Sequence, residues 1–105
     1  MRNYELMILL DPSLQEEEIS AMTKKVQQSI TNNQGKIFRT NQWGKRKLAY
    51  EIKKKTEAIY VVFDFELEPE NIANIEKNIK YEEKIIRYLI VLGQEKVLSA
   101  KDQNK

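Results

Sequence analysis

Residues 58–67 have the sequence AIYVVFDFEL, a run of β-branched and aromatic residues that contains neither glycine nor proline. This composition is typical of a β-strand. Successive side chains of a strand point to opposite faces of the sheet, so alternate positions can be assigned to faces. One set is wholly apolar and predicts the core face: Ile59, Val61, Phe63 and Phe65. The other set begins apolar and ends acidic: Tyr60, Val62, Asp64 and Glu66.

The chain on both sides of this strand predicts two helices and three more strands. Apolar residues at spacings of three and four indicate a helix over about residues 14–33. Pro69 suits the first position of a second helix. Gly44 lies inside a long strand region and predicts a bulge or bend there. The polar residues 53–57 predict a connection between strands. The expected strands cover residues 3–10, 36–53, 58–67 and 85–92.

This order of elements predicts the fold class. Two βαβ units in succession give the ferredoxin-like split βαβ arrangement (βαββαβ) of the α+β class. Right-handed crossovers then place both helices on one face of a four-stranded antiparallel sheet. We assign residues 1–93 to this single domain and residues 94–105 to a polar C-terminal tail, expected to be disordered in isolation.

The composition excludes several kinds of chemistry. The chain of 105 residues contains no cysteine and no histidine, so it has no thiolate metal site and no Ser-His or Cys-His nucleophile pair. Its three glycines are scattered and form no phosphate-binding loop. No apolar run is long enough to cross a bilayer. We therefore expect a cytoplasmic protein that is not an enzyme and has no cofactor, metal, membrane or small-molecule substrate.

The charges are strongly segregated, although their sum is only +2. Residues 36–55 hold eight Lys or Arg and one acid, whereas residues 56–83 hold eight acids and two lysines. A concentrated basic segment is the electrostatic footprint of phosphate binding. The same lysines are also consistent with a solvated strand edge that is protected from aggregation.

The face of the sheet opposite the helices is predicted to carry apolar residues. Alternation on the fourth strand assigns Ile86 and Tyr88 to the core face and Leu89 to the opposite face. The residues expected on the uncovered face are Met7, Leu9, Tyr60, Val62, Leu89 and Val91. A contiguous exposed apolar patch is typical of a binding surface. The alternative is that central strands are simply apolar on both sides.

The segment Trp43 to Lys53 alternates cations with aromatic and aliphatic residues. In a strand, Arg46 and Lys53 could reach phosphates while Trp43 and Tyr50 pack or stack. Arginine suits phosphate because its planar fork binds two oxygens at once. Leu48 is expected to pack in a core.

The same segment, Gly44-x-Arg46-x-Leu48-Ala49-Tyr50-x-Ile52-Lys53 preceded by Trp43, resembles the signature of the bacterial small-subunit ribosomal protein six family. The resemblance covers about residues 1–92, and the chain departs from it at Glu51, where many members have proline. Further similarities to the family are Met1-Arg2-Asn3-Tyr4-Glu5, Asp11-Pro12, Gly35-Lys36, Tyr60 and Ile86-Arg87.

The resemblance implies a ferredoxin-like fold and a place on the bacterial ribosome. It also implies binding to the central domain (platform) of 16S rRNA as a heterodimer with ribosomal small-subunit protein eighteen. From the resemblance and the charge pattern together, the expected RNA-binding residues are Arg2, Tyr4, Lys45, Arg46, Lys53 and Arg87. The expected partner-binding residues are Met7, Leu9, Trp43, Tyr60, Val62, Leu89 and Val91.

Two other functions remain open from the sequence. An RNA-recognition-motif-like domain has the same strand order, but its third strand usually begins with a basic residue and glycine, where this chain has Glu57 and Ala58. Only Tyr60 is available there to stack on a base. A small ferredoxin-like homodimeric enzyme or ligand-binding protein could also join through its open faces, although the absence of His and Cys argues against this.

Overall fold

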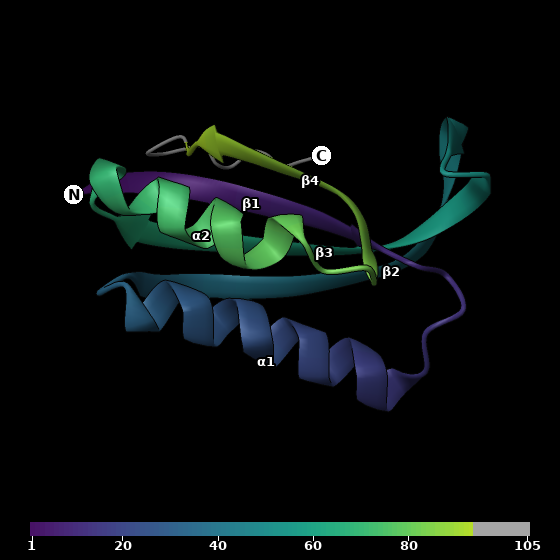
Figure 1. Cartoon of the computed structure of the whole chain (residues 1–105), viewed down its shortest axis with the longest axis horizontal. Helices are drawn as coiled ribbons and strands as arrows, with labels where there is room; N and C mark the ends of the chain where they lie inside the picture. The colour runs from purple at the N-terminus through teal and green to yellow at the C-terminus, as the bar shows by residue number, and fades with distance from the viewer. Residues whose placement is uncertain (94–105) are drawn as a thin grey trace.

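The computed structural model describes residues 1–93 and has the expected order of elements (Figure 1). The sheet is antiparallel with strand order β2-β3-β1-β4. The elements are β1 (Arg2–Leu10), α1 (Glu16–Asn32), β2 (Lys36–Ile52), β3 (Lys55–Leu67), the short 3-10 helix η1 (Pro69–Asn71), α2 (Ile72–Lys80) and β4 (Ile85–Leu92). The ferredoxin-like fold is thereby confirmed. The predicted tail, residues 94–105, lies outside the described residues.

Both helices pack on one face of the sheet and enclose the main core (Figure 1). Fully burying one such apolar side chain stabilises the fold by about 1.5–3 kcal/mol, so this layer dominates the stability. The helices contribute Ile19, Met22, Val26, Ile30, Ile75 and Ile79. The strands contribute Leu6, Ile8, Leu10, Ile59, Val61, Phe63, Phe65 and Leu67.

Strand β2 departs from regular pairing with β3 at three places. The register shifts between Ile37 and Arg39, between Gln42 and Gly44, and between Lys47 and Ile52. The bulge predicted at Gly44 is confirmed, and the φ angle of this glycine is +84°. Bulges bend a strand and increase its twist. The distal ends of β2 and β3, residues 45–57, accordingly turn away from the sheet at the right of Figure 1, and we call this segment the arm.

The tip of the arm is tighter than the sequence predicted. Ile52 pairs with Lys55, so the connection is a two-residue turn and not the five-residue link expected over 53–57. Lys53 and Lys54 have φ angles of 51° and 66°. Two successive positive φ angles are characteristic of a type I′ turn, whose twist matches that of a β-hairpin. The turn therefore places two lysines in a conformation that favours glycine or asparagine.

Replacing Lys54 with glycine should stabilise the fold. A side chain in the left-handed region costs about 1–2 kcal/mol, and the greater freedom of glycine in the unfolded chain offsets part of that gain. We expect Lys54→Gly to raise the free energy of unfolding by about 0.5–1 kcal/mol in urea denaturation. Lys54→Ala is the control, because it keeps a Cβ atom and should give no comparable gain.

Candidate RNA and partner interface

The arm folds back over part of the open face, which is the sheet face opposite the helices. Leu48 and Ile52 of the arm pack against a small buried cluster formed by Leu9, Ala58 and Ile86. Leu9 and Ile86 belong to β1 and β4, which do not pair with β2. The arm therefore contributes to a second small core that also includes residues of β1, β3 and β4.

Two residues expected on the uncovered face are in fact buried. Only 7% of Leu9 and 3% of Val62 is exposed. Leu9 belongs to the small cluster against which the arm packs, and Val62 lies between neighbouring strands, opposite Met7 on one side and Asn41 on the other. The expectation that their side chains are free for a partner is wrong, because this chain covers them itself.

A bulge also moves Ile86 to the open face. Leu9 pairs with Arg87 and Leu10 pairs with Ile85, so Ile86 has no residue opposite it. The extra residue interrupts the alternation of faces. Ile86 therefore joins Leu9 in the small core, where simple alternation had assigned it to the helix-covered face.

The rest of the open face remains accessible. Leu89 and Val91 on β4 are 57% and 41% exposed. Met7 lies opposite Leu89, and Glu5 lies opposite Val91 on one side and Asp64 on the other. Glu5, Met7, Asp64, Leu89 and Val91 are therefore neighbours on the sheet, and we call them the bare patch.

The bare patch carries two acidic groups that face each other across β1 and β3. Burial and the charge of Asp64 raise the pKa of Glu5. Burial also raises the pKa of Asp64, although the Arg39 guanidinium opposes part of that rise. Like charges directly opposite on a sheet are destabilising. Both acids are visible in the sequence on the face opposite the helices, where Glu5 precedes Met7 and Asp64 follows Val62, but neither was assigned a role.

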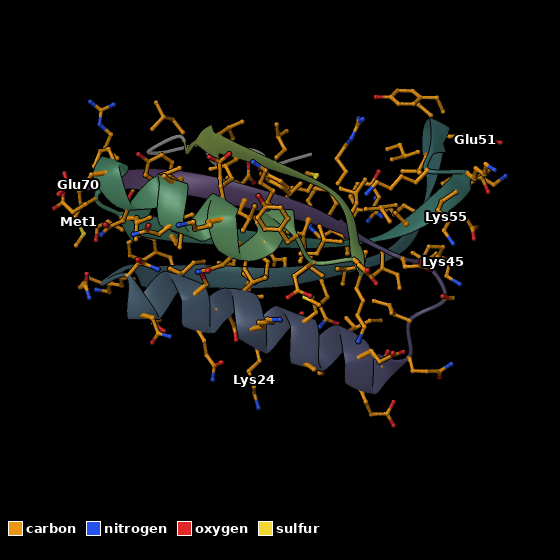
Figure 2. The ribbon with its side chains drawn as sticks, viewed as in Figure 1. Met1, Lys24, Lys45, Glu51, Lys55 and Glu70 are labelled. Carbon is orange, nitrogen blue, oxygen red and sulfur yellow. The ribbon has the colours of Figure 1, made fainter. Side chains whose placement is uncertain are left out.

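Most of the predicted RNA-binding cations gather at the arm. Lys45, Arg46 and Lys53 are exposed on it. Figure 2 shows Lys45 and Lys55 at the end of the molecule far from Met1. Exposed Arg87 of β4 joins this group, since its Nη1 donates a hydrogen bond of 3.2 Å to the hydroxyl of Tyr50 on the arm.

An aromatic column orients one of these cations. The rings of Trp43 and Tyr60 stack with their centroids 6.1 Å apart and their planes 8° from parallel. The Arg46 guanidinium lies 5.3 Å from the Trp43 ring centroid. A guanidinium over an indole face is held by cation–π attraction while its N–H groups stay free at the edge. The contact with Trp43 therefore restricts the orientation of the Arg46 guanidinium group while leaving its N–H groups exposed to solvent.

The structure does not bring Arg2 and Tyr4 to this cluster. Arg2 lies beside Met1 at the opposite end of the molecule, where β1 begins. Tyr4 is only 9% exposed and stacks on Phe65 at a centroid distance of 5.8 Å. The prediction of an RNA-binding role for Tyr4 does not fit this burial, because alternation along β1 places its ring under the helices.

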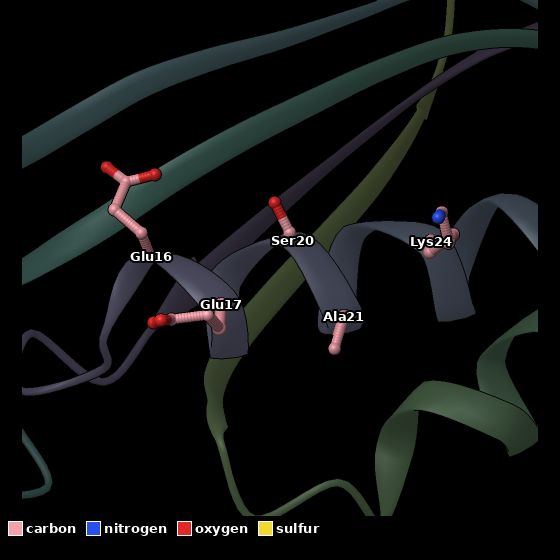
Figure 3. Close-up of a pocket in the computed structure, with 5 residues that line it drawn as sticks. All are labelled: Glu16, Glu17, Ser20, Ala21 and Lys24. Carbon is pink, nitrogen blue, oxygen red and sulfur yellow. The ribbon is translucent and has the colours of Figure 1, made fainter.

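A further surface feature lies on α1. Figure 3 shows a hollow on α1 whose lining residues are all exposed on the helix: Glu16, Glu17, Ser20, Ala21 and Lys24. Within residues 1–93, no cluster of three potential His, Cys, Asp or Glu metal ligands is found. In the same part of the chain, no helix has the length and apolar character needed to cross a membrane.

The four-stranded antiparallel sheet with two helices on one face defines a ferredoxin-like α+β protein. The Ribosomal protein S6 family model matches residues 3–92. The chain therefore belongs to the ribosomal protein S6 family.

Curated relatives and a solved structure agree with this assignment. Small ribosomal subunit protein bS6 of Micrococcus luteus is 40% identical over 100 residues, which are 95% of this chain and 99% of that protein. The protein of the same name from Dictyoglomus turgidum is 41% identical over 92 residues, covering 88% and 95%. The crystal structure of 30S ribosomal protein S6 from Thermotoga maritima superposes with a TM-score of 0.84 at 33% identity, covering 88% of this chain and 87% of that one.

Replacing Glu5 with glutamine should stabilise the isolated chain at neutral pH. Because the folded-state pKa of Glu5 is raised, this residue adds to the stability of the fold at pH values below 4.5, its ordinary pKa. That contribution is lost as the pH rises through the folded-state pKa. Ionised Glu5 is therefore unfavourable at pH 7 relative to a neutral side chain of the same shape. We expect Glu5→Gln to raise the free energy of unfolding by about 0.2–1 kcal/mol at pH 7.

The gain should be absent at pH 3, where Glu5 and Asp64 are both protonated. Urea denaturation at the two pH values measures the difference. Glu83→Gln is the matched control, because Glu83 is exposed outside the bare patch. An equal gain at both pH values would show that the effect does not come from charge repulsion.

Proposed function

We propose that this chain is a structural constituent of the small ribosomal subunit and binds the central domain (platform) of 16S rRNA together with ribosomal small-subunit protein eighteen. The observation that carries the proposal is the cluster of Lys45, Arg46, Lys53 and Arg87 at the arm of an S6-family fold. The chain acts by binding and positioning, without catalysis. Its proposed location is the ribosome in the bacterial cytoplasm.

The arm is the proposed RNA-binding surface. Its lysines neutralise phosphates as mobile point charges, whereas Arg46 can bind two phosphate oxygens with its planar fork. The stack on Trp43 supports this role, because a guanidinium that is already oriented loses less freedom on binding. Arg87 contributes from β4, where its bond to Tyr50 keeps it beside the arm. Arg2 remains a separate candidate contact at the other end of the molecule.

The bare patch is the proposed surface for the protein partner. Its apolar members Met7, Leu89 and Val91 lie in register on adjacent strands. Covering exposed apolar surface is favourable by roughly 25 cal/mol per Å², before the costs of association. Trp43 and Tyr60 border this surface and stay in the proposal, whereas Leu9 and Val62 leave it because they are buried.

The stacking of Tyr60 argues against the RNA-recognition-motif alternative. That mode requires an exposed ring on which a base can lie. Here the Tyr60 ring is half-buried and stacks against Trp43. The proposed RNA contacts are accordingly phosphate contacts of the arm and not bases laid across the open face.

Binding of platform RNA by the isolated chain should be weak and strongly dependent on salt. Each neutralised phosphate contributes a slope of about −0.9 to the plot of log affinity against log salt, so four contacts predict roughly a 100-fold loss between 50 and 200 mM salt. Titration of labelled platform RNA with the chain, with and without protein eighteen, measures both effects. Adding the partner should raise the affinity substantially. Equal affinities for the chain alone and for the pair would contradict joint binding.

Removing the charge of Arg46 should weaken RNA binding without unfolding the chain. Loss of one phosphate contact predicts an affinity about 5- to 10-fold lower and a salt slope reduced by about one. Lys24→Gln is the matched control, because Lys24 projects from α1 away from the sheet (Figure 2). If Arg46→Gln and Lys24→Gln changed the affinity equally, the effect would reflect net charge alone, and the arm would not be the RNA-binding surface.

A further inference from the structure

We infer that the bare patch binds a segment of the protein partner in which a Lys or Arg side chain lies beside aliphatic residues, with the cation placed between Glu5 and Asp64. The inference deepens the proposed function and rests on it, since it specifies the chemistry of the partner segment. Neither acidic residue has a role in the phosphate contacts of the arm.

The arrangement of the bare patch suits such a segment. Along one row across the sheet, Arg39, Asp64, Glu5 and Val91 are neighbours on successive strands. The adjacent row on the same face carries Met7 and Leu89, beside the buried Val62. Residues two apart on a strand are about 7 Å apart, the same repeat as in an extended peptide. An extended peptide can therefore place a cation at the row of Glu5 and Asp64 and an aliphatic side chain, two residues away, at the adjacent apolar row.

The charges of the patch are not balanced within the described residues. Glu5 and Asp64 face each other, and the one cation paired with this row is Arg39 at the far side of Asp64. Among residues 1–93, neither carboxylate forms an ion pair within 4.0 Å. Two acids placed in this way weaken the isolated chain. A cation from the partner would convert that repulsion into two attractive contacts.

The same charges argue against other occupants. RNA would bring phosphates against two carboxylates, and the arm offers it cations instead. A second copy of this chain, joined patch to patch by a two-fold axis, would bring the acidic pair of each copy toward that of the other. A cationic polypeptide segment is the occupant that removes the repulsion.

The test compares the affinity for the partner with the stability of the isolated chain. Full-length Glu5→Gln, Asp64→Asn and the control Glu83→Gln are titrated with purified protein eighteen by calorimetry at low salt, and each chain is melted alone. We expect the two patch variants to bind about 10-fold more weakly while melting at higher temperature than the unsubstituted chain. The control should change neither property.

These opposite changes separate partner binding from a purely structural role, which would move affinity and stability together or leave the affinity unchanged. Charge reversal gives a second test: Glu5→Lys should abolish binding, and an acidic substitution of one Lys or Arg in the partner should restore it. Unchanged affinity in Glu5→Gln and Asp64→Asn would overturn the inference while leaving the proposed function intact. Failure of the unsubstituted chain to bind protein eighteen would instead contradict the proposed function itself.

Discussion

The packing of the arm onto the open face is the contact on which the rest of the surface depends. Leu48 and Ile52 pack against the small core of Leu9, Ala58 and Ile86, and two of these three residues belong to strands that β2 does not pair with. This contact buries one end of a face that the topology would otherwise leave open. It also holds the arm's cations at that end, and the hydrogen bond between Arg87 and Tyr50 joins β4 to them. The other end stays accessible as the bare patch.

The resulting surface is divided by charge as well as by shape. The arm presents Lys45, Arg46 and Lys53, whereas the bare patch presents Glu5 and Asp64 beside aliphatic side chains. Opposite charges on separate surfaces favour different ligands, since each surface repels what the other attracts. A net charge of +2 conceals this division completely. The two surfaces of this small domain therefore differ in the sign of the charge that they present.

The sequence predictions were accurate where a feature depends on residues close together in the chain. They were wrong where it depends on residues of different strands. Strand and helix positions depend on local periodicity, and their bounds agree closely with the expected ones except at the start of β3, which begins at Lys55 and not at residue 58. The bend at Gly44 was also visible locally, as a glycine within a strand. The errors at Leu9, Val62 and Ile86 have another origin, because each concerns burial by residues of neighbouring strands or a bulge between β1 and β4. Alternation assigns a residue to a face but cannot say what covers that face.

The sequence by itself determined the order of elements, the face of β1 and of β3 that packs under the helices and the clustering of cations in one segment. These features depend on patterns of two and of three to four residues, which operate within a single element. Only the tertiary structure decided which apolar side chains stay exposed and that Glu5 faces Asp64. Those outcomes depend on strand register, on three register shifts between β2 and β3 and on contacts between residues distant in the chain. No pattern within a single helix or strand encodes these register shifts and long-range contacts.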